Sequence, residues 1–130
     1  ASGIESTPDF KTAVRYHLDS VENRDLATFK TTLTNTNQLN VIFPGGGILE
    51  STQAVIDFHE GWFKDRDWIF ETEIVKTIEA QTQSTALVKY NYRDKLDSEP
   101  RQAWLVLTFQ LENNSWRLVH DQNTRIDLEK

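Results

Sequence analysis

Apolar residues recur at three- and four-residue steps in three segments of the chain, the spacing that places them on one face of an α-helix. The first segment follows Thr7 and Pro8, a capping residue and a proline that suits the first helical turn. Asp25 and Ser51 are the expected caps of the second and third helices. The expected buried stripes are Phe10, Val14, His17, Leu18 and Val21, then Leu26, Phe29 and Leu33, and finally Val55, Phe58, His59, Trp62 and Phe63.

From Trp68 onward the apolar period changes from about 3.6 to 2, which indicates β-strands. Asn113 and Asn114 tolerate the positive φ angles of a tight hairpin, so we expect the last two strands to be joined there. Helices followed by a run of strands are typical of an α+β domain. The expected strands are a short one over residues 39–43, ended by the turn Pro44-Gly45-Gly46-Gly47, and longer ones over 68–75, 82–93, 102–111 and 116–126.

The strand over residues 102–111 is apolar on both faces. Ala103, Leu105 and Leu107 share one face, while Trp104 and Val106 occupy the other. A sheet with helices on one side and water on the other alternates more cleanly. A second copy of the chain is the simplest cover for the outer face, and we therefore expect a homodimer formed through it.

Composition narrows the classes of partner and compartment. The 130 residues suit a single domain over 1–130, and the net charge is −6, from 20 acidic and 14 basic side chains. Such a chain is repelled by phosphate backbones and anionic lipids, so we expect neither nucleic acid nor a membrane as a partner. There is no cysteine, no apolar run of membrane-spanning length and no signal-like start. The cytoplasm is the expected location, although a removed signal peptide would leave no trace.

The order of elements and the segment from Trp116 to Thr124 resemble the nuclear transport factor 2-like superfamily. The branch is the SnoaL-like one, similar to the association domain of calcium/calmodulin-dependent kinase. Members often read Trp-x-Ile-x-His-x-His-x-Ser where this chain has Trp116-Arg117-Leu118-Val119-His120-Asp121-Gln122-Asn123-Thr124. The resemblance implies a cone-shaped α+β fold, in which three N-terminal helices pack on a strongly bent antiparallel sheet around a pocket. It also implies dimerisation through the outer sheet face.

His120 is the candidate catalytic residue. Strict alternation along the final strand places His120 and Gln122 on the face of Trp116 and Leu118, the face expected to line the pocket. The imidazole would then be a general acid/base and the amide a ligand contact. A core histidine bonded to a backbone carbonyl or a tyrosine is an equally weighted alternative. Asp121 is expected on the opposite face, in solvent or at a subunit contact.

Tyr16, His59, Trp62, Tyr90 and Tyr92 are the other candidate ligand-binding residues. The resemblance puts the two strand tyrosines on the pocket side, where each offers an apolar ring with a hydroxyl group. A structural role is favoured for His59 by about three to one, because buried polar groups are usually paired. The three histidines show no metal-binding spacing, and the glycine run lacks a phosphate-binding pattern, so we expect neither a metal nor a cofactor.

Two functions remain open on these residues. The first is a small-molecule pocket protein, with an isomerase, cyclase or dehydratase type of reaction on a small carbonyl compound as its chemistry. The alternative is a non-catalytic dimeric binding or assembly module. An isomerase of this kind needs an inward carboxylate base, and the expected inner faces offer none.

Overall fold

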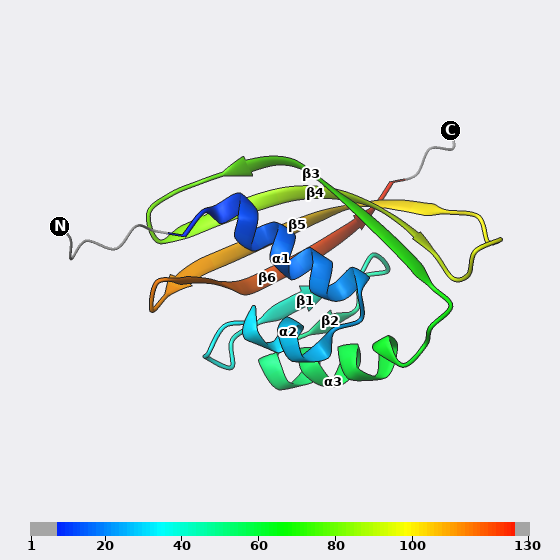
Figure 1. Cartoon of the computed structure of the whole chain (residues 1–130), viewed down its shortest axis with the longest axis horizontal. Coiled ribbons are helices and arrows are strands. Elements are labelled where there is room, and N and C mark those ends of the chain that lie inside the picture. The colour runs from blue at the N-terminus through cyan, green and yellow to red at the C-terminus, as the bar shows by residue number, and fades with distance from the viewer. Residues whose placement is uncertain (1–7, 127–130) are drawn as a thin grey trace.

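The computed structural model describes residues 8–126, and its helices all lie on one side of a curved sheet (Figure 1). This arrangement confirms the α+β fold predicted from the sequence. The elements in chain order are α1 (Phe10–Glu22), α2 (Leu26–Thr31), β1 (Asn40–Ile42), β2 (Ile48–Leu49), α3 (Thr52–Phe63), β3 (Ile69–Ile78), β4 (Gln83–Arg93), β5 (Arg101–Glu112) and β6 (Ser115–Arg125).

The sheet is mixed, whereas an antiparallel sheet was expected. Its six strands run in the order β2-β1-β6-β5-β4-β3, and β1 lies parallel to β6 while every other pair is antiparallel. The third helix follows β1 and β2, so the three helices are not all N-terminal to the sheet. In Figure 1, α1 crosses the concave face and α3 lies beyond its β1–β2 edge.

Each helix begins at a side-chain cap. Asp25 and Ser51 accept backbone N–H bonds from Thr28 and Ala54 at 3.2 and 3.1 Å, as predicted. The first helix differs from the prediction, because Asp9 is its cap and Pro8 precedes the cap. Thr7 lies outside the described residues.

The core forms where α1 meets β4, β5 and β6. Phe10 contacts Phe109 and Trp116 edge to face, with ring centroids 5.6 and 5.1 Å apart. Such aromatic pairs add about 0.5–1.5 kcal/mol beyond the burial of their area. The Trp116 indole also donates to the Pro8 carbonyl at 2.9 Å. These contacts fix α1 across one end of the sheet and leave the other end to the cavity described below.

A β-bulge at Val119 interrupts β6. Leu118 is opposite Phe109 and His120 is opposite Thr108, so Val119 has no partner of its own on β5. An extra residue in one strand moves every following side chain to the other face. At the bulge, β6 changes its parallel neighbour. Before it, Leu118 forms an isolated parallel bridge with Leu33, and after it, β6 pairs with strand β1.

The hairpin after β5 has the predicted geometry. Asn113 and Asn114 adopt φ angles of 49° and 64°, the left-handed region that asparagine tolerates. Upstream of the bulge, Trp116 and Leu118 are buried in the core. The face assignment predicted for β6 is therefore correct up to Leu118 and reversed after Val119.

Candidate functional site

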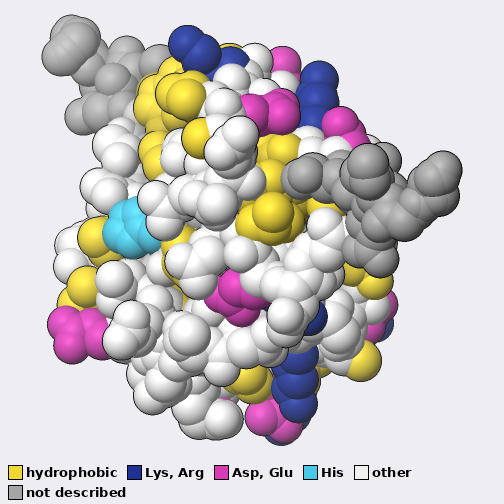
Figure 2. Space-filling view, turned by 90° about the vertical axis from the view of Figure 1, so that its left-hand side faces the viewer, with side chains coloured by type: hydrophobic (Ala, Val, Ile, Leu, Met, Phe, Trp, Pro, Cys, Tyr) yellow, Lys and Arg dark blue, Asp and Glu magenta, His cyan; other side chains and the backbone are white. Residues whose placement is uncertain are grey.

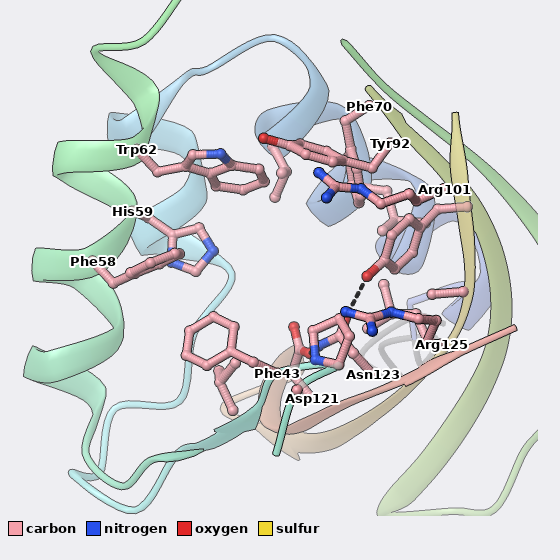
Figure 3. Close-up of a pocket in the computed structure, with 18 of the residues that line it drawn as sticks. Phe43, Phe58, His59, Trp62, Phe70, Tyr92, Arg101, Asp121, Asn123 and Arg125 are labelled. Carbon is pink, nitrogen blue, oxygen red and sulfur yellow. Dashed lines mark hydrogen bonds between the residues drawn. The ribbon is translucent and has the colours of Figure 1, made fainter. Parts of the chain in front are cut away.

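A cavity of about 330 Å³ lies between α3 and the concave face of the sheet. Helices α1 and α3, the β1–β2 turn and strands β3 to β6 all contribute to its lining, shown in Figure 3. This volume is near the lower limit of the roughly 300–1,000 Å³ usual for small-molecule pockets. The lining residues used below are His17, Phe43, Phe58, His59, Trp62, Phe70, Tyr90, Tyr92, Arg101, Asp121, Asn123 and Arg125.

Aromatic rings form one wall of the cavity. Trp62 stacks on the fully buried Trp68, with centroids 4.2 Å apart and planes 14° from parallel. Phe58, one turn earlier on α3, packs against Phe43 at 4.9 Å. Stacking on a buried ring holds Trp62 in place, so the wall is rigid and presents flat apolar surface.

A chain of hydrogen bonds on β4, β6 and β1 forms the polar side of the cavity. The Tyr90 hydroxyl donates to Asn123 Oδ1 at 2.7 Å. The Asn123 amide in turn donates to the Ile42 carbonyl at 2.7 Å and to Asp121 Oδ1 at 3.0 Å. Every polar atom of Asn123 is thus engaged, and the side chain holds the Asp121 carboxyl group in a fixed position.

Asp121 is the acidic residue of the cavity. The residue as a whole borders the cavity and is half-buried. Its carboxyl group is surrounded by protein atoms. Burial disfavours the charged form and raises the pKa of Asp121 to about 7, while the hydrogen bond from Asn123 opposes this shift. A carboxyl group that titrates near neutral pH can both accept and return a proton.

Two buried histidines, His17 on α1 and His59 on α3, both contact the Phe29 ring, with centroids 5.5 and 4.2 Å away. The His59 Nδ1 atom donates to the Val55 carbonyl at 2.8 Å. Thr32 Oγ1 donates to the Phe29 carbonyl, so His17 Nδ1 must donate to Thr32 Oγ1, 2.8 Å away. Both rings are therefore held as tautomers with an unprotonated Nε2 atom.

Burial keeps both histidines neutral. It lowers the pKa of His17 to about 3, with a smaller contribution from the nearby His59. Burial likewise lowers the pKa of His59 to about 4, against the hydrogen bond to Val55. At pH 7 these rings can accept hydrogen bonds through Nε2 but cannot act as cations or acids.

The structure brings some of the sequence-predicted residues to the cavity and places the others elsewhere. His59, Trp62, Tyr90 and Tyr92 line the cavity. Tyr16 does not, because it projects from α1 into solvent with 54% of its surface exposed.

The expectation that His120 and Gln122 look into the pocket is wrong. They contact each other on the outer face, with His120 Nε2 and Gln122 Oε1 3.3 Å apart. The bulge at Val119 is the physical reason, since it reverses the faces of all later residues. For the same reason Asp121, expected in solvent or at a subunit contact, points inward.

Sequence reasoning missed Asp121, Asn123, Arg101 and Arg125. The one available signal is the pair of adjacent apolar residues Leu118 and Val119 in a strand that otherwise alternates. Two consecutive apolar positions can mark a bulge, and the alternation restarted from Val119 would have placed Asp121 and Asn123 inward.

No three His, Cys, Asp or Glu side chains within residues 8–126 come together in a way that could hold a metal ion. In the same part of the chain, no helix is long and apolar enough to cross a membrane. The face drawn in Figure 2 carries acidic and basic side chains interspersed, without a continuous basic surface.

A bent sheet covered by helices on one face and enclosing an apolar cavity defines the nuclear transport factor 2-like class of folds. The chain belongs to the SnoaL-like family of this class, because residues 11–123 match the SnoaL-like domain. No curated protein sequence matches the chain.

Solved structures from several bacteria share the fold. A candidate calcium/calmodulin-dependent protein kinase type II association domain from Thiobacillus denitrificans has a TM-score of 0.80 at 16% identity, covering 95% of this chain and 100% of its own. A candidate dehydratase of the NTF2-like family from Streptomyces avermitilis reaches 0.79 at 9% identity, covering 93% and 96%. A ketosteroid isomerase-like protein from Erwinia carotovora atroseptica reaches 0.75 at 12%, covering 95% and 98%. Identities this low establish a common fold alone.

The buried histidines should make the protein sensitive to acid. Their folded pKa values lie below the unfolded value of about 6.5, so their contribution to stability is present above pH 6.5 and is lost as pH falls toward 4. His59→Phe keeps the stack on Phe29, whose centroid is 4.2 Å away, and removes one titrating group. The unfolding free energy of the wild type should fall between pH 6.5 and pH 4. In this variant we expect the fall to be smaller by up to about 3 kcal/mol.

Urea denaturation at these two pH values measures the difference. Phe43→Leu is the matched control, because it alters the same wall through its contact with Phe58, removes no titrating group and should keep the wild-type acid dependence. Identical pH dependence in wild type and His59→Phe would contradict a neutral His59.

Asp121 should have the opposite pH dependence. Its folded pKa lies above the unfolded value, so its contribution to stability is present below about pH 4 and is lost as pH rises through 7. Asp121→Asn should therefore raise the unfolding free energy at pH 8, by about 1–3 kcal/mol after allowance for the partly open site. The gain should vanish at pH 4, where the aspartic acid is neutral. Asp97→Asn, on an exposed loop, serves as the control in the same denaturation series.

Proposed function

We propose that the protein binds a small, largely apolar carbonyl compound in this cavity and catalyses a proton transfer on it, with Asp121 as the acid/base. The observation that carries the proposal is the inward carboxyl group of Asp121 at the edge of an aromatic cavity, where burial raises its pKa to about 7. Asp121 is the only Asp or Glu among the described residues of the lining. A base poised near the working pH combines correct protonation with sufficient driving force.

The reaction starts at a carbon next to the ligand's carbonyl group. The Asp121 carboxylate takes a proton from that carbon, and the carbonyl becomes an enolate or enol. Return of the proton from Asp121 to another carbon completes an isomerisation. Transfer of the same proton to a β-hydroxyl, which then leaves as water while a carbon–carbon double bond forms, completes a dehydration. Asn123 is a positioning residue in this scheme, because it holds the Asp121 carboxyl at 3.0 Å.

Developing charge on the carbonyl oxygen requires a hydrogen-bond donor. Tyr92 lines the cavity, and its hydroxyl makes no hydrogen bond within the described part of the chain. The Tyr90 hydroxyl is already engaged with Asn123, so it supports Asp121 and is not the free donor. We assign the donor role to Tyr92, which leaves His17 and His59 as neutral acceptors.

The comparisons support this class of reaction without fixing it. The neighbours include one protein described as a dehydratase and one as ketosteroid isomerase-like, and both reaction types need a base beside an apolar pocket. The inward carboxylate that the sequence did not reveal is supplied here by Asp121, whereas His120 and Gln122 lie on the outer face.

Exchange of carbon-bound protons tests the catalytic proposal. 2-Tetralone is a small aromatic ketone, and NMR can follow exchange of its α-protons with solvent deuterium. The wild-type protein should accelerate exchange with a rate that rises with pH and has a midpoint near 7, the pKa of Asp121. Asp121→Asn should lose about 10²–10⁴-fold of the catalysed rate.

His120→Asn is the matched control, since it alters the outer face of the same strand and should keep the wild-type rate. Equal loss of rate in both variants, or a full rate in Asp121→Asn, would refute the role of Asp121.

The outer sheet face supports a second proposal, that the protein is a homodimer and acts as a binding or assembly module. Trp104 is 36% exposed on that face, opposite Lys89 on β4. Leu87 and Val106 form the adjacent cross-strand pair and are half-buried. Apolar surface at the centre of an uncovered sheet face favours a partner copy.

Substituting Trp104→Asp places a charge at the centre of this face and should convert a dimer into a monomer. Sedimentation velocity at micromolar concentration measures the change. Leu96→Asp is the control, because Leu96 is 74% exposed on the β4–β5 loop and should leave the dimer intact. A monomeric wild type at this concentration would rule out the dimer.

A further inference from the structure

Two arginines lie in the cavity of a chain whose net charge is −6. Arg101 begins β5 and Arg125 ends β6. Arg125 is opposite Ala103 in the ladder, two residues along from Arg101, so the two side chains are diagonal neighbours on the same face. The positive charge of the cavity is therefore concentrated on one side.

An ion pair satisfies only one of the two arginines. Arg101 pairs with Asp94 at 3.0 Å, and both side chains are more than half exposed, at 55% and 65%. Arg125 makes no ion pair or hydrogen bond within the described residues. Exposed pairs like the first contribute little, so the arginine pair retains the capacity to bind an anion.

Both charges act on the interior of the cavity. Arg125 and Arg101 each favour the ionised form of Tyr90 and oppose the burial that raises the pKa of its hydroxyl. The Arg101 guanidinium also lies 5.3 Å from the centre of the Tyr92 ring. Arg101 and Arg125 thus border the polar side of the site, and Arg101 also lies beside Tyr92, the residue assigned to the carbonyl oxygen.

Flat apolar surface faces the arginines across the cavity. In Figure 3, Trp62, His59 and Phe58 project from α3 on one side, while Arg101 and Arg125 project from the sheet on the other. A ligand with a ring or planar chain toward α3 and an anion toward the sheet would match both sides of the site. Guanidinium groups match the two oxygens of a carboxylate in geometry as well as charge.

We infer that the natural ligand is a small aromatic or planar unsaturated carbonyl compound that carries a carboxylate. Its carboxylate binds between Arg101 and Arg125, its planar part packs on Trp62 and Phe58, and its reacting carbon lies near Asp121. The inference rests on the proposed function and adds the chemical class of the substrate to it. The cavity of about 330 Å³ limits this class to small molecules.

A matched pair of probes isolates the charge. 4-Acetylbenzoate and 4-acetylbenzamide have the same ring and ketone, and differ in that only the first is an anion. Isothermal titration calorimetry at pH 7.5 should give about tenfold tighter binding of the benzoate to the wild-type protein. Arg125→Gln should weaken the benzoate about tenfold and change the amide less than twofold.

Lys89→Gln is the control for a general loss of positive charge, because Lys89 lies on the outer face beside Trp104. It should bind both probes as the wild type does. Circular dichroism and thermal melting of each variant show whether it is folded.

Three outcomes separate the inference from the proposed function. The inference is supported if Arg125→Gln binds 4-acetylbenzoate more weakly than the wild type does and binds 4-acetylbenzamide equally well. Equal affinity of the wild type for both probes overturns it and leaves the pocket function intact. If neither probe binds at up to millimolar concentration, the inference is overturned, and so is the proposal that the cavity binds aromatic carbonyl compounds.

Discussion

The unpaired residue in β6 is the constraint on which the rest of the site depends. Because Val119 has no partner on β5, the strand presents Trp116 and Leu118 to the core and then Asp121, Asn123 and Arg125 to the cavity. One strand thus builds both the packed end and the open end of the concave face. Without the bulge, strict alternation would direct a histidine and a glutamine inward and leave the carboxyl group outside.

The surroundings of the cavity then determine its chemistry. Burial raises the pKa of the aspartic acid and lowers those of the histidines, so that near pH 7 the carboxyl group is the one that titrates. Asn123 fixes the carboxyl, and backbone or hydroxyl partners fix both imidazoles. The site combines a movable proton with neutral acceptors and an apolar wall, and its cations are confined to the sheet side.

Much of the fold could be predicted from local signals. Asp25, Ser51 and the Asn113-Asn114 turn each act through hydrogen bonds or dihedral angles set by neighbouring residues, and the structure bears them out. Tyr90 and Tyr92 face the cavity as expected, because the ladder between β4 and β5 runs without a break and a period of two holds along it. The parallel pairing of β1 with β6 was missed, since it joins segments about 80 residues apart. The bulge accompanies the change of neighbour from Leu33 to β1, and its one local signal, the adjacent apolar pair Leu118 and Val119, was not used.

The pKa of Asp121 is the most direct test of this account. Carbon-13 NMR of the side-chain carboxyl groups, with Asp121→Asn to assign the resonance, follows its titration in the intact protein. A midpoint near pH 7 is expected, because the bulge places the carboxyl group in a protein-enclosed position. A midpoint near 4, the ordinary value for an exposed aspartic acid, would mean that the carboxyl group is solvated and that β6 does not present it to the cavity.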